Sequence, residues 1–293
     1  MNRPKILVTG SNGQLGKELQ AVSNHYPEFE FFFLSKEELP IHLSDEIHSY
    51  FASLRPEYCI NCAAYTAVDR AETEQELAFL VNGESAGKLA DACNSYNAKF
   101  IHISTDYVFS GNATIPYKED DAVDPVNIYG ASKLRGEELV GSYNAQSIII
   151  RTSWVYSEFG NNFVKTMLRL MKDKERIGVV NDQLGSPTYA ADLARLIVNI
   201  VKADHWQAGI YHYSNEGIIT WYEFADAIRE ISGSKCLVTP ITTADFPTAA
   251  KRPAYSVFNT AKIKHRYNFT IPGWKESLYA CIQRLNESTL TVK

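Results

Sequence analysis

The feature that most limits how this chain can fold is a glycine-rich turn close to its start. An apolar run over residues 5–9 leads into Gly10, Gly13 and Gly16, in the spacing G-x-x-G-x-x-G, and then into a helical segment. In a strand-turn-helix unit the first glycine permits a tight turn, the second lets backbone amides approach a pyrophosphate, and the third lets the helix pack on the strand. The turn therefore predicts a phosphate cradle, although three glycines alone also occur in ordinary turns.

Strand-like and helix-like segments alternate along the first half of the chain. The expected strands cover residues 5–9, 29–34, 58–61, 99–104 and 148–151, and the expected helices cover residues 15–23, 47–54, 75–96 and 130–141. This alternation predicts an α/β fold with a Rossmann-type doubly wound parallel sheet.

The second half of the chain is less regular and richer in aromatic residues. It predicts helices over residues 162–171, 191–202 and 220–231 and strands over residues 177–181 and 209–214. Because 293 residues exceed one average domain, we expect a second, smaller lobe. We predict a dinucleotide-binding Rossmann domain over residues 1–155, to which later segments return, and a substrate-binding lobe mainly over residues 156–293.

Tyr129 and Lys133 are four residues apart, so a helix would place the phenol and the ammonium group on one face. A tyrosine has a pKa of about 10, and a fixed cation nearby would help it to donate a proton near neutral pH. The pair is therefore a candidate proton-donating site. The alternative is an ordinary pair on a solvated helix face.

A third polar site follows the buried-looking strand that ends at Ser104. Ligands of open α/β sheets bind at the carboxyl ends of strands, so the Thr105 hydroxyl could hydrogen-bond a substrate carbonyl oxygen beside Tyr129. The alternative interpretation is a Ser-Thr-Asp turn with no ligand.

Together these segments resemble the extended short-chain dehydrogenase/reductases and, within them, the dTDP-4-dehydrorhamnose reductase family. The resemblance runs along nearly the whole chain, and its most specific parts are the Ala-Tyr-Thr-Ala-Val-Asp-Arg-Ala-Glu segment at residues 64–72, Thr-Ser-Trp-Val-Tyr at 152–156, Asp-Gln-x-Gly-x-Pro-Thr at 182–188 and Lys-Arg-Pro at 251–253.

The resemblance implies an NAD(P)H-dependent oxidoreductase that reduces the C4 keto group of dTDP-4-dehydro-6-deoxy-L-mannose (dTDP-6-deoxy-L-lyxo-4-hexulose) to dTDP-L-rhamnose. This is the last step of dTDP-rhamnose biosynthesis, which supplies lipopolysaccharide and other cell-surface polysaccharides. The positions that match catalytic residues of the family are Thr105, Tyr129 and Lys133. The positions that match substrate contacts are Thr105, Asp106, Trp154, Asn162 and Arg252.

The resemblance also implies which residues bind NADPH or NADH. Besides Tyr129 and Lys133, they are Gly10, Gly13, Gln14, Leu15, Gly16, Ser35, Lys36, Ile41, Ala63, Ala64, Tyr65 and Thr66. An NAD-preferring site usually has a carboxylate where Ser35 stands, whereas Lys36 could attract the 2'-phosphate of NADPH. We therefore expect NADPH to be accepted, although Glu37 and Glu38 lie close in sequence. Family members have an Asp followed by a hydrophobic residue near the adenine, and this chain has Pro40-Ile41 at these positions. The polar contact that the Asp makes near the adenine is therefore in doubt.

Three other functions remain open. Nucleotide-sugar 4,6-dehydratases carry Asp-Glu where this chain has Asp106-Tyr107, so dehydration is disfavoured. Another nucleotide-sugar 4-ketoreductase or an epimerase would share the Thr105, Tyr129 and Lys133 set. A homologous non-catalytic regulatory subunit, such as that of methionine adenosyltransferase, would keep the fold, and the intact catalytic set argues against it.

Some family members dimerise through a metal held by surface glutamates. Glu18 matches the first of these positions, but Ala191 stands at the second with Asp192 beside it, so a bridging Mg²⁺ is not expected. Either a monomer or a homodimer is compatible with this. Cys59 and Cys62 form a C-x-x-C inside an apolar strand without a second pair, which favours core packing over zinc or redox chemistry.

Composition limits the partners. The formal net charge is −5 and no basic stripe is visible, which argues against nucleic acid binding. No apolar run approaches the ~20 residues that cross a bilayer, and the start of the chain lacks the pattern of a signal peptide. The five scattered cysteines are typical of reduced thiols. We therefore expect a cytoplasmic protein with a dTDP-sugar substrate and no membrane partner.

Overall fold

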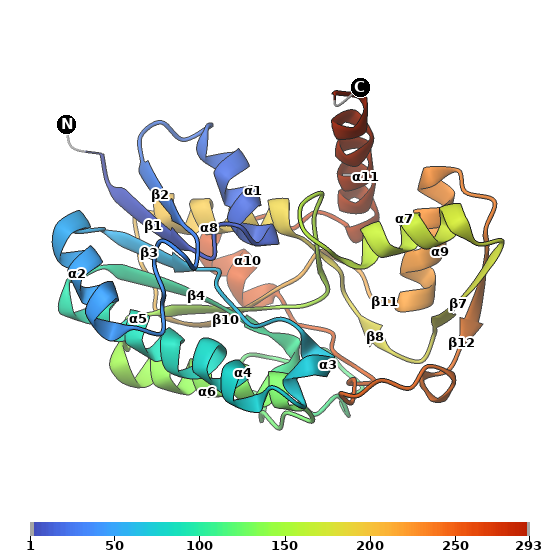
Figure 1. Ribbon diagram of the computed structural model, residues 1–293, viewed down its shortest axis with the longest axis horizontal. Helices are drawn as coiled ribbons and strands as arrows, with labels where there is room; N and C mark the ends of the chain where they lie inside the picture. The colour runs from blue at the N-terminus through green and yellow to red at the C-terminus, as the bar shows by residue number, and fades with distance from the viewer. Residues whose placement is uncertain (1–2, 292–293) are drawn as a thin grey trace.

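The computed structural model describes residues 3–291, so the outermost ends of both predicted lobes, residues 1–2 and 292–293, lie outside the described residues. Its centre is a six-stranded parallel sheet, as the alternation predicted (Figure 1). The strand order is β10-β5-β4-β3-β1-β2. The strands are β1 (Lys5–Thr9), β2 (Glu30–Leu34), β3 (Tyr58–Asn61), β4 (Lys99–Thr105), β5 (Ile148–Thr152) and β10 (Gly209–Tyr213).

Helices cover both faces of this sheet (Figure 1). Apolar residues of α1 (Gln14–Ser23), α8 (Ala190–Lys202) and α10 (Ala261–Tyr267) join one buried cluster with β1, β3 and β5. Apolar residues of α2 (Ser44–Leu54), α5 (Ser85–Ser95) and α6 (Ile128–Tyr143) form the cluster on the other face. The strands are buried from both sides, which explains their continuous apolar runs, such as Ile148-Ile149-Ile150.

The strand order reverses between β1 and β3, and a crevice is expected there at the carboxyl ends of the strands. Gly10 follows β1 with a φ of +66°, and a Cβ at this position would lie 2.5 Å from the backbone nitrogen of Ala63, which follows β3. Gly10 is therefore needed for both its left-handed backbone and its close approach to the next loop.

A smaller group of elements packs around a separate aromatic cluster, on the right of Figure 1. Its helices are α7 (Phe163–Asp173), α9 (Trp221–Ser232) and α11 (Trp274–Thr291). Its strand pairs are β6 (Val155–Tyr156) with β9 (Thr188–Tyr189), β7 (Arg176–Val180) with β12 (Leu237–Ile241), and β8 (Leu184–Gly185) with β11 (Ile219–Thr220). A separate cluster of this kind is what a second lobe requires, and the division at residue 155 stays a prediction.

The predicted strands and helices are present, with ends shifted by at most three residues, except for the helix predicted over residues 75–96. That helix is divided into α4 (Gln75–Phe79), a π-helical turn (Leu80–Glu84) and α5. The side chain of Asn82 in the turn accepts from the backbone nitrogen of Tyr65 at 2.8 Å and donates to its carbonyl oxygen at 3.0 Å. The side chain of Asn82 in the π-helical turn therefore binds the loop after β3.

Short elements complete the fold. They are α3 (Val68–Ala71) and the 3-10 turns Asp106–Val108 and Thr243–Asp245. Within residues 3–291, the helices are each too short or too polar to pass through a lipid bilayer.

Candidate active site

Two adjoining cavities lie at the carboxyl ends of the central strands. The first has a volume of about 680 Å³ and the second about 600 Å³. They share four lining residues, Gly13, Cys62, Ala63 and Ala64, and so form one continuous crevice at the reversal point of the sheet. We name them the dinucleotide cavity and the catalytic cavity.

The glycine turn fits a dinucleotide phosphate group. Gly13 is the N-cap of α1, and its exposed backbone faces both cavities. A Cβ at Gly16 would lie 2.5 Å from the carbonyl oxygen of Gly10, so only glycine lets the helix start this close to the turn. The free N–H groups at the start of α1 can then face an anion.

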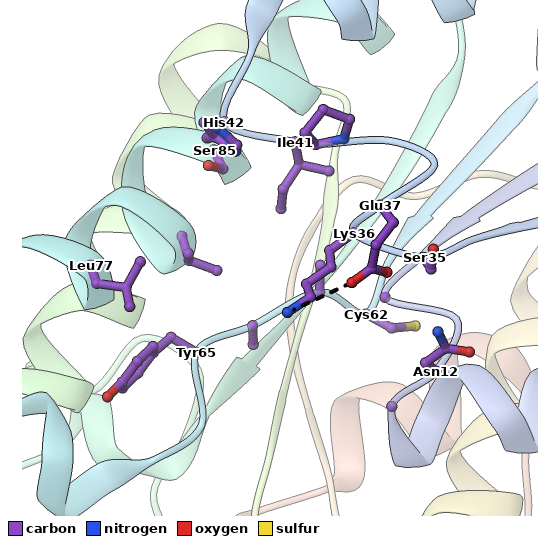
Figure 2. Close-up of a pocket in the computed structure, with 16 residues that line it drawn as sticks. Asn12, Ser35, Lys36, Glu37, Ile41, His42, Cys62, Tyr65, Leu77 and Ser85 are labelled. Carbon is purple, nitrogen blue, oxygen red and sulfur yellow. Dashed lines mark ion pairs between the residues drawn. The ribbon is translucent and has the colours of Figure 1, made fainter. Parts of the chain in front are cut away.

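The far end of the dinucleotide cavity is lined by Ser35, Lys36 and Ile41, the residues for which the prediction is a contact with the adenosine side of the cofactor (Figure 2). The ammonium group of Lys36 lies 3.7 Å from the carboxylate of Glu37, and its side chain is 90% exposed. Glu38 instead accepts from the backbone nitrogen of Ser35 at 2.8 Å. One cation and one carboxylate therefore reach this end of the cavity, and Figure 2 shows them pointing toward each other.

Thr105, Tyr129 and Lys133 all line the catalytic cavity. Burial raises the pKa of the Tyr129 phenol to about 12, an effect that the Thr105 side chain partly opposes. The expected lowering of this pKa by the Lys133 ammonium is not among the effects that act on the phenol. Lys133 donates to the carbonyl oxygen of Ile103 at 2.6 Å, and burial lowers its pKa to about 8.

Asp106 lies beside Thr105 in the same cavity and is 2% exposed. Its Oδ1 accepts from the Thr105 hydroxyl at 3.0 Å, whereas its Oδ2 has no hydrogen-bond partner in the part of the chain that the structure describes. Burial raises the pKa of this carboxyl group to about 6. A buried oxygen without a partner is costly and is suited to a ligand hydroxyl.

Trp154 lines the catalytic cavity where the two groups of elements meet. Its φ of +47° is unusual for a residue with a side chain. The indole stacks on Trp221 with ring centroids 3.5 Å apart and an angle of 11°. A Cβ at Gly185 would lie 2.5 Å from the same indole, so the ring is tightly confined.

The predicted site residues are otherwise distributed as follows. The dinucleotide cavity is lined by Gly10, Ala63, Ala64 and Tyr65, and the catalytic cavity by Gln14, Leu15 and Thr66. Among the described residues that were predicted as site residues, three line neither cavity: Gly16, Asn162 and Arg252.

Asn162 and Arg252 hold the walls of the crevice. Asn162 caps α7 by accepting from the backbone nitrogen of Lys165 at 3.1 Å, and it donates to the Gln14 side chain at 2.9 Å. Arg252 forms an ion pair with Asp69 at 2.9 Å, and its Nη1 is buried with no partner among the described residues. A polar group at the crevice edge could therefore still bind Arg252.

Sequence reasoning missed several lining residues, of which Tyr107 is the most prominent. Its ring meets that of Tyr129 edge-on, with centroids 5.6 Å apart, and the guanidinium of Arg252 lies 5.9 Å from the centroid of the Tyr107 ring. Because Tyr107 directly follows the predicted site residues Thr105 and Asp106, its position in the sequence could have identified it as a lining residue. Cys62 was assigned to the core, and it also lines both cavities.

The two carboxylates considered for a metal lie in the interior. Glu18 is buried and accepts from the Ser157 hydroxyl at 2.6 Å, while Asp192 binds Arg195, Asn215 and Ser277. Over residues 3–291 no cluster of three or more His, Cys, Asp or Glu side chains is arranged to hold a metal ion.

Comparison with known proteins identifies the family. A family model described as the RmlD substrate binding domain matches residues 4–287. A dTDP-4-dehydrorhamnose reductase from Aggregatibacter actinomycetemcomitans is 41% identical over 94% of this chain and 97% of its own length. The chain belongs to the dTDP-4-dehydrorhamnose reductase family.

Two further proteins are similar to this chain over most of its length. The spore coat polysaccharide biosynthesis protein SpsK of Bacillus subtilis (strain 168) is 43% identical over 95% of this chain and 97% of its own. The crystal structure of dTDP-4-dehydrorhamnose reductase from Bacillus anthracis str. Ames, in complex with NADP, superimposes with a TM-score of 0.93 at 41% identity. The match covers 97% of this chain and all of that one.

Proposed function

We propose that this protein reduces the C4 keto group of dTDP-6-deoxy-L-lyxo-4-hexulose to give dTDP-L-rhamnose, with NADPH or NADH as the reductant. One observation carries the proposal. Thr105, Tyr129 and Lys133 line a single cavity that continues, through Gly13 and Ala63, into the glycine turn. Membership of the family supplies the substrate class.

The reaction needs a hydride and a proton at the sugar carbonyl. When bound, the reduced nicotinamide supplies the hydride. Tyr129, neutral because its pKa is raised to about 12, carries the proton for the developing alkoxide. Thr105 lies beside the phenol, and its single O–H, which donates to Asp106 in the structure, can turn to donate a hydrogen bond to the same oxygen. The two N–H groups of Lys133 that do not bind Ile103 are available to the ribose hydroxyls and to the tyrosinate.

The rest of the substrate would occupy the walls of the catalytic cavity. The free Oδ2 of Asp106 can accept from a sugar hydroxyl, and the confined indole of Trp154 offers an apolar surface to the deoxysugar. The unpartnered Nη1 of Arg252 suits the diphosphate. Asn162 contributes by fixing the loop next to Gln14 rather than by lining the cavity.

At the adenosine end, Lys36 favours NADPH and Glu37 suits the ribose hydroxyls of NADH, so use of both cofactors is expected. The Bacillus anthracis enzyme was solved with NADP, which supports NADPH. We place the reaction in the cytoplasm, where nucleotide sugars and reduced nicotinamides are found, and we expect a monomer or a homodimer.

The experiment that tests the proposal follows the oxidation of NADPH and of NADH by purified protein at 340 nm, with the dTDP-4-keto sugar and, for comparison, its UDP counterpart. Turnover that is fastest with the dTDP-sugar supports the reductase. Turnover only with another nucleotide sugar would show that this sugar, and not the proposed dTDP-sugar, is the substrate. No oxidation of either cofactor, despite measurable cofactor binding, would favour the non-catalytic regulatory role.

A further inference from the structure

Behind the catalytic lysine lies a buried histidine whose side chain no step of the proposed reaction uses. His102 is in β4, 1% exposed, and its Nε2 lies 3.5 Å from the Nζ of Lys133. On its other side, Nδ1 lies 3.0 Å from the side-chain nitrogen of Asn61 in β3. The imidazole therefore links the end of one strand to the lysine of α6.

The orientation of Asn61 can be assigned. Its side-chain oxygen faces the backbone nitrogen of Ala63 at 3.1 Å, and a backbone N–H can only donate. The Thr9 hydroxyl donates to the same oxygen at 2.8 Å. The amide nitrogen of Asn61 must therefore be the atom that faces His102, and it donates a proton to Nδ1.

This assignment fixes the tautomer of His102. Burial and the neighbouring Lys133 hold the pKa of His102 well below its usual range, so the ring is neutral. A neutral imidazole has one N–H, and because Nδ1 accepts from Asn61, the hydrogen lies on Nε2. That N–H points at Lys133. The separation of 3.5 Å is long for an N–H···N hydrogen bond, as expected where two donors face each other.

An N–H dipole directed at an ammonium group disfavours its charge, whereas a neutral amine could accept the hydrogen bond. We propose that His102, oriented by Asn61, is a positioning residue that weakens the hold of Lys133 on its proton and thereby sets the upper pH limit of the reduction. The inference about the pH limit rests on the function proposed above, whereas the effect on the lysine does not depend on the substrate.

The ionisable groups near Lys133 include Cys62, Tyr129 and Glu137. Burial raises the pKa of the Cys62 thiol at the end of β3 and that of the Tyr129 phenol on α6, so both stay protonated. Glu137, one turn further along α6, forms an ion pair at 2.7 Å with Arg151 of β5 and acts on the lysine in the opposite sense. Burial lowers the pKa of Lys133 to about 8, so the lysine titrates in a range where the Cys62 thiol and the Tyr129 phenol stay protonated.

The test is the titration of Lys133 by NMR in protein labelled with ¹³C at the lysine Cε, without substrate or cofactor. The Lys133 signal is identified by its absence in Lys133→Met. His102→Gln can place an acceptor oxygen toward the lysine, so its midpoint should move up by about one pH unit, and the alkaline fall of kcat should move with it. An unchanged Lys133 midpoint in His102→Gln would overturn the inference.

His212 provides a matched control. It is also fully buried, and its Nε2 lies 3.4 Å from the guanidinium of Arg151. His212→Gln should leave the Lys133 midpoint where it is; an equal shift would show a general effect of removing a buried histidine and would contradict the inference. If His102→Gln does not fold, His102→Asn keeps an acceptor for Asn61, removes the N–H that faces the lysine, and should give the same upward shift.

Discussion

The glycine turn allows fold stability and cofactor binding to be separated by two substitutions three residues apart. Gly10 has a φ of +66°, and a methyl group there would lie 2.5 to 2.7 Å from backbone atoms of residues 62 and 63. Gly13 has a φ of −74°, which any residue adopts, and the Gly10 carbonyl oxygen would lie 3.2 Å from its methyl group. Gly10→Ala should therefore damage the fold, and Gly13→Ala the binding site.

The magnitudes follow from these geometries. A left-handed alanine costs about 1–2 kcal/mol, and an overpacked contact that cannot rotate away adds about 1–3 kcal/mol, so Gly10→Ala should lower the free energy of unfolding by roughly 2–5 kcal/mol. For Gly13→Ala, the lower entropy of the unfolded chain offsets the tight contact, and stability should change by less than about 1 kcal/mol. Losing a backbone hydrogen bond to a phosphate should cost about 1.5–3 kcal/mol, or roughly 10- to 100-fold in the Kd of NADPH.

Urea unfolding measures the free energy of unfolding, and fluorescence titration with NADPH measures the Kd of NADPH on the same samples. The reasoning predicts a stable Gly13→Ala protein that binds NADPH weakly. A Gly13→Ala protein with wild-type affinity for NADPH would refute the phosphate cradle. A Gly10→Ala protein as stable as the wild type would refute the conclusion that Gly10 is needed where it approaches the loop after β3.

Three further predictions concern the rest of the site. Trp221→Ala removes the ring on which Trp154 stacks, so the KM for the nucleotide sugar should rise about 3- to 10-fold while the Kd of NADPH is unchanged, and Trp221→Phe should restore most of the loss; equal effects on both ligands would argue against this role. Burial raises the pKa of Glu18 from 4.5 to about 8, so the folded protein retains a proton that the unfolded chain releases. The free energy of unfolding should thus decrease from about pH 4.5 to about pH 8, and Glu18→Gln should remove this part of the slope, which urea unfolding at several pH values would reveal. Lys36→Ala should weaken NADPH by up to about 1 kcal/mol and leave NADH unaffected in the same titration; a parallel loss for both would exclude a specific contact with the 2'-phosphate.

Features that depend on short spacings could be predicted from the sequence. Gly10, Gly13 and Gly16 form the turn at the start of α1, and Tyr129 and Lys133 face one cavity because four residues are about one helical turn. The parallel sheet followed from apolar runs separated by helical segments.

Contacts between distant residues could not be predicted in the same way. Arg252 meets Asp69 across 183 residues, and Asn162 meets Gln14 across 148, so no local pattern encodes either pairing. The family resemblance implied ligand contacts for Asn162 and Arg252, and the structure adds the bonds that hold them to the crevice walls. The π-helical turn is similar, because its Asn82 side chain donates to the Tyr65 carbonyl oxygen and to the Ser132 hydroxyl, which are distant in sequence.

The central claim is that hydride reaches C4 of a dTDP-linked 4-keto sugar while Tyr129 supplies the proton. The most direct measurement uses NADPH deuterated at C4 of the nicotinamide and identifies the sugar product by NMR and mass spectrometry, for the wild type and Tyr129→Phe. We predict dTDP-L-rhamnose with one deuterium at C4, and a loss of at least about 100-fold in kcat for Tyr129→Phe. A product without deuterium at C4, or a Tyr129→Phe protein with wild-type turnover, would contradict the account.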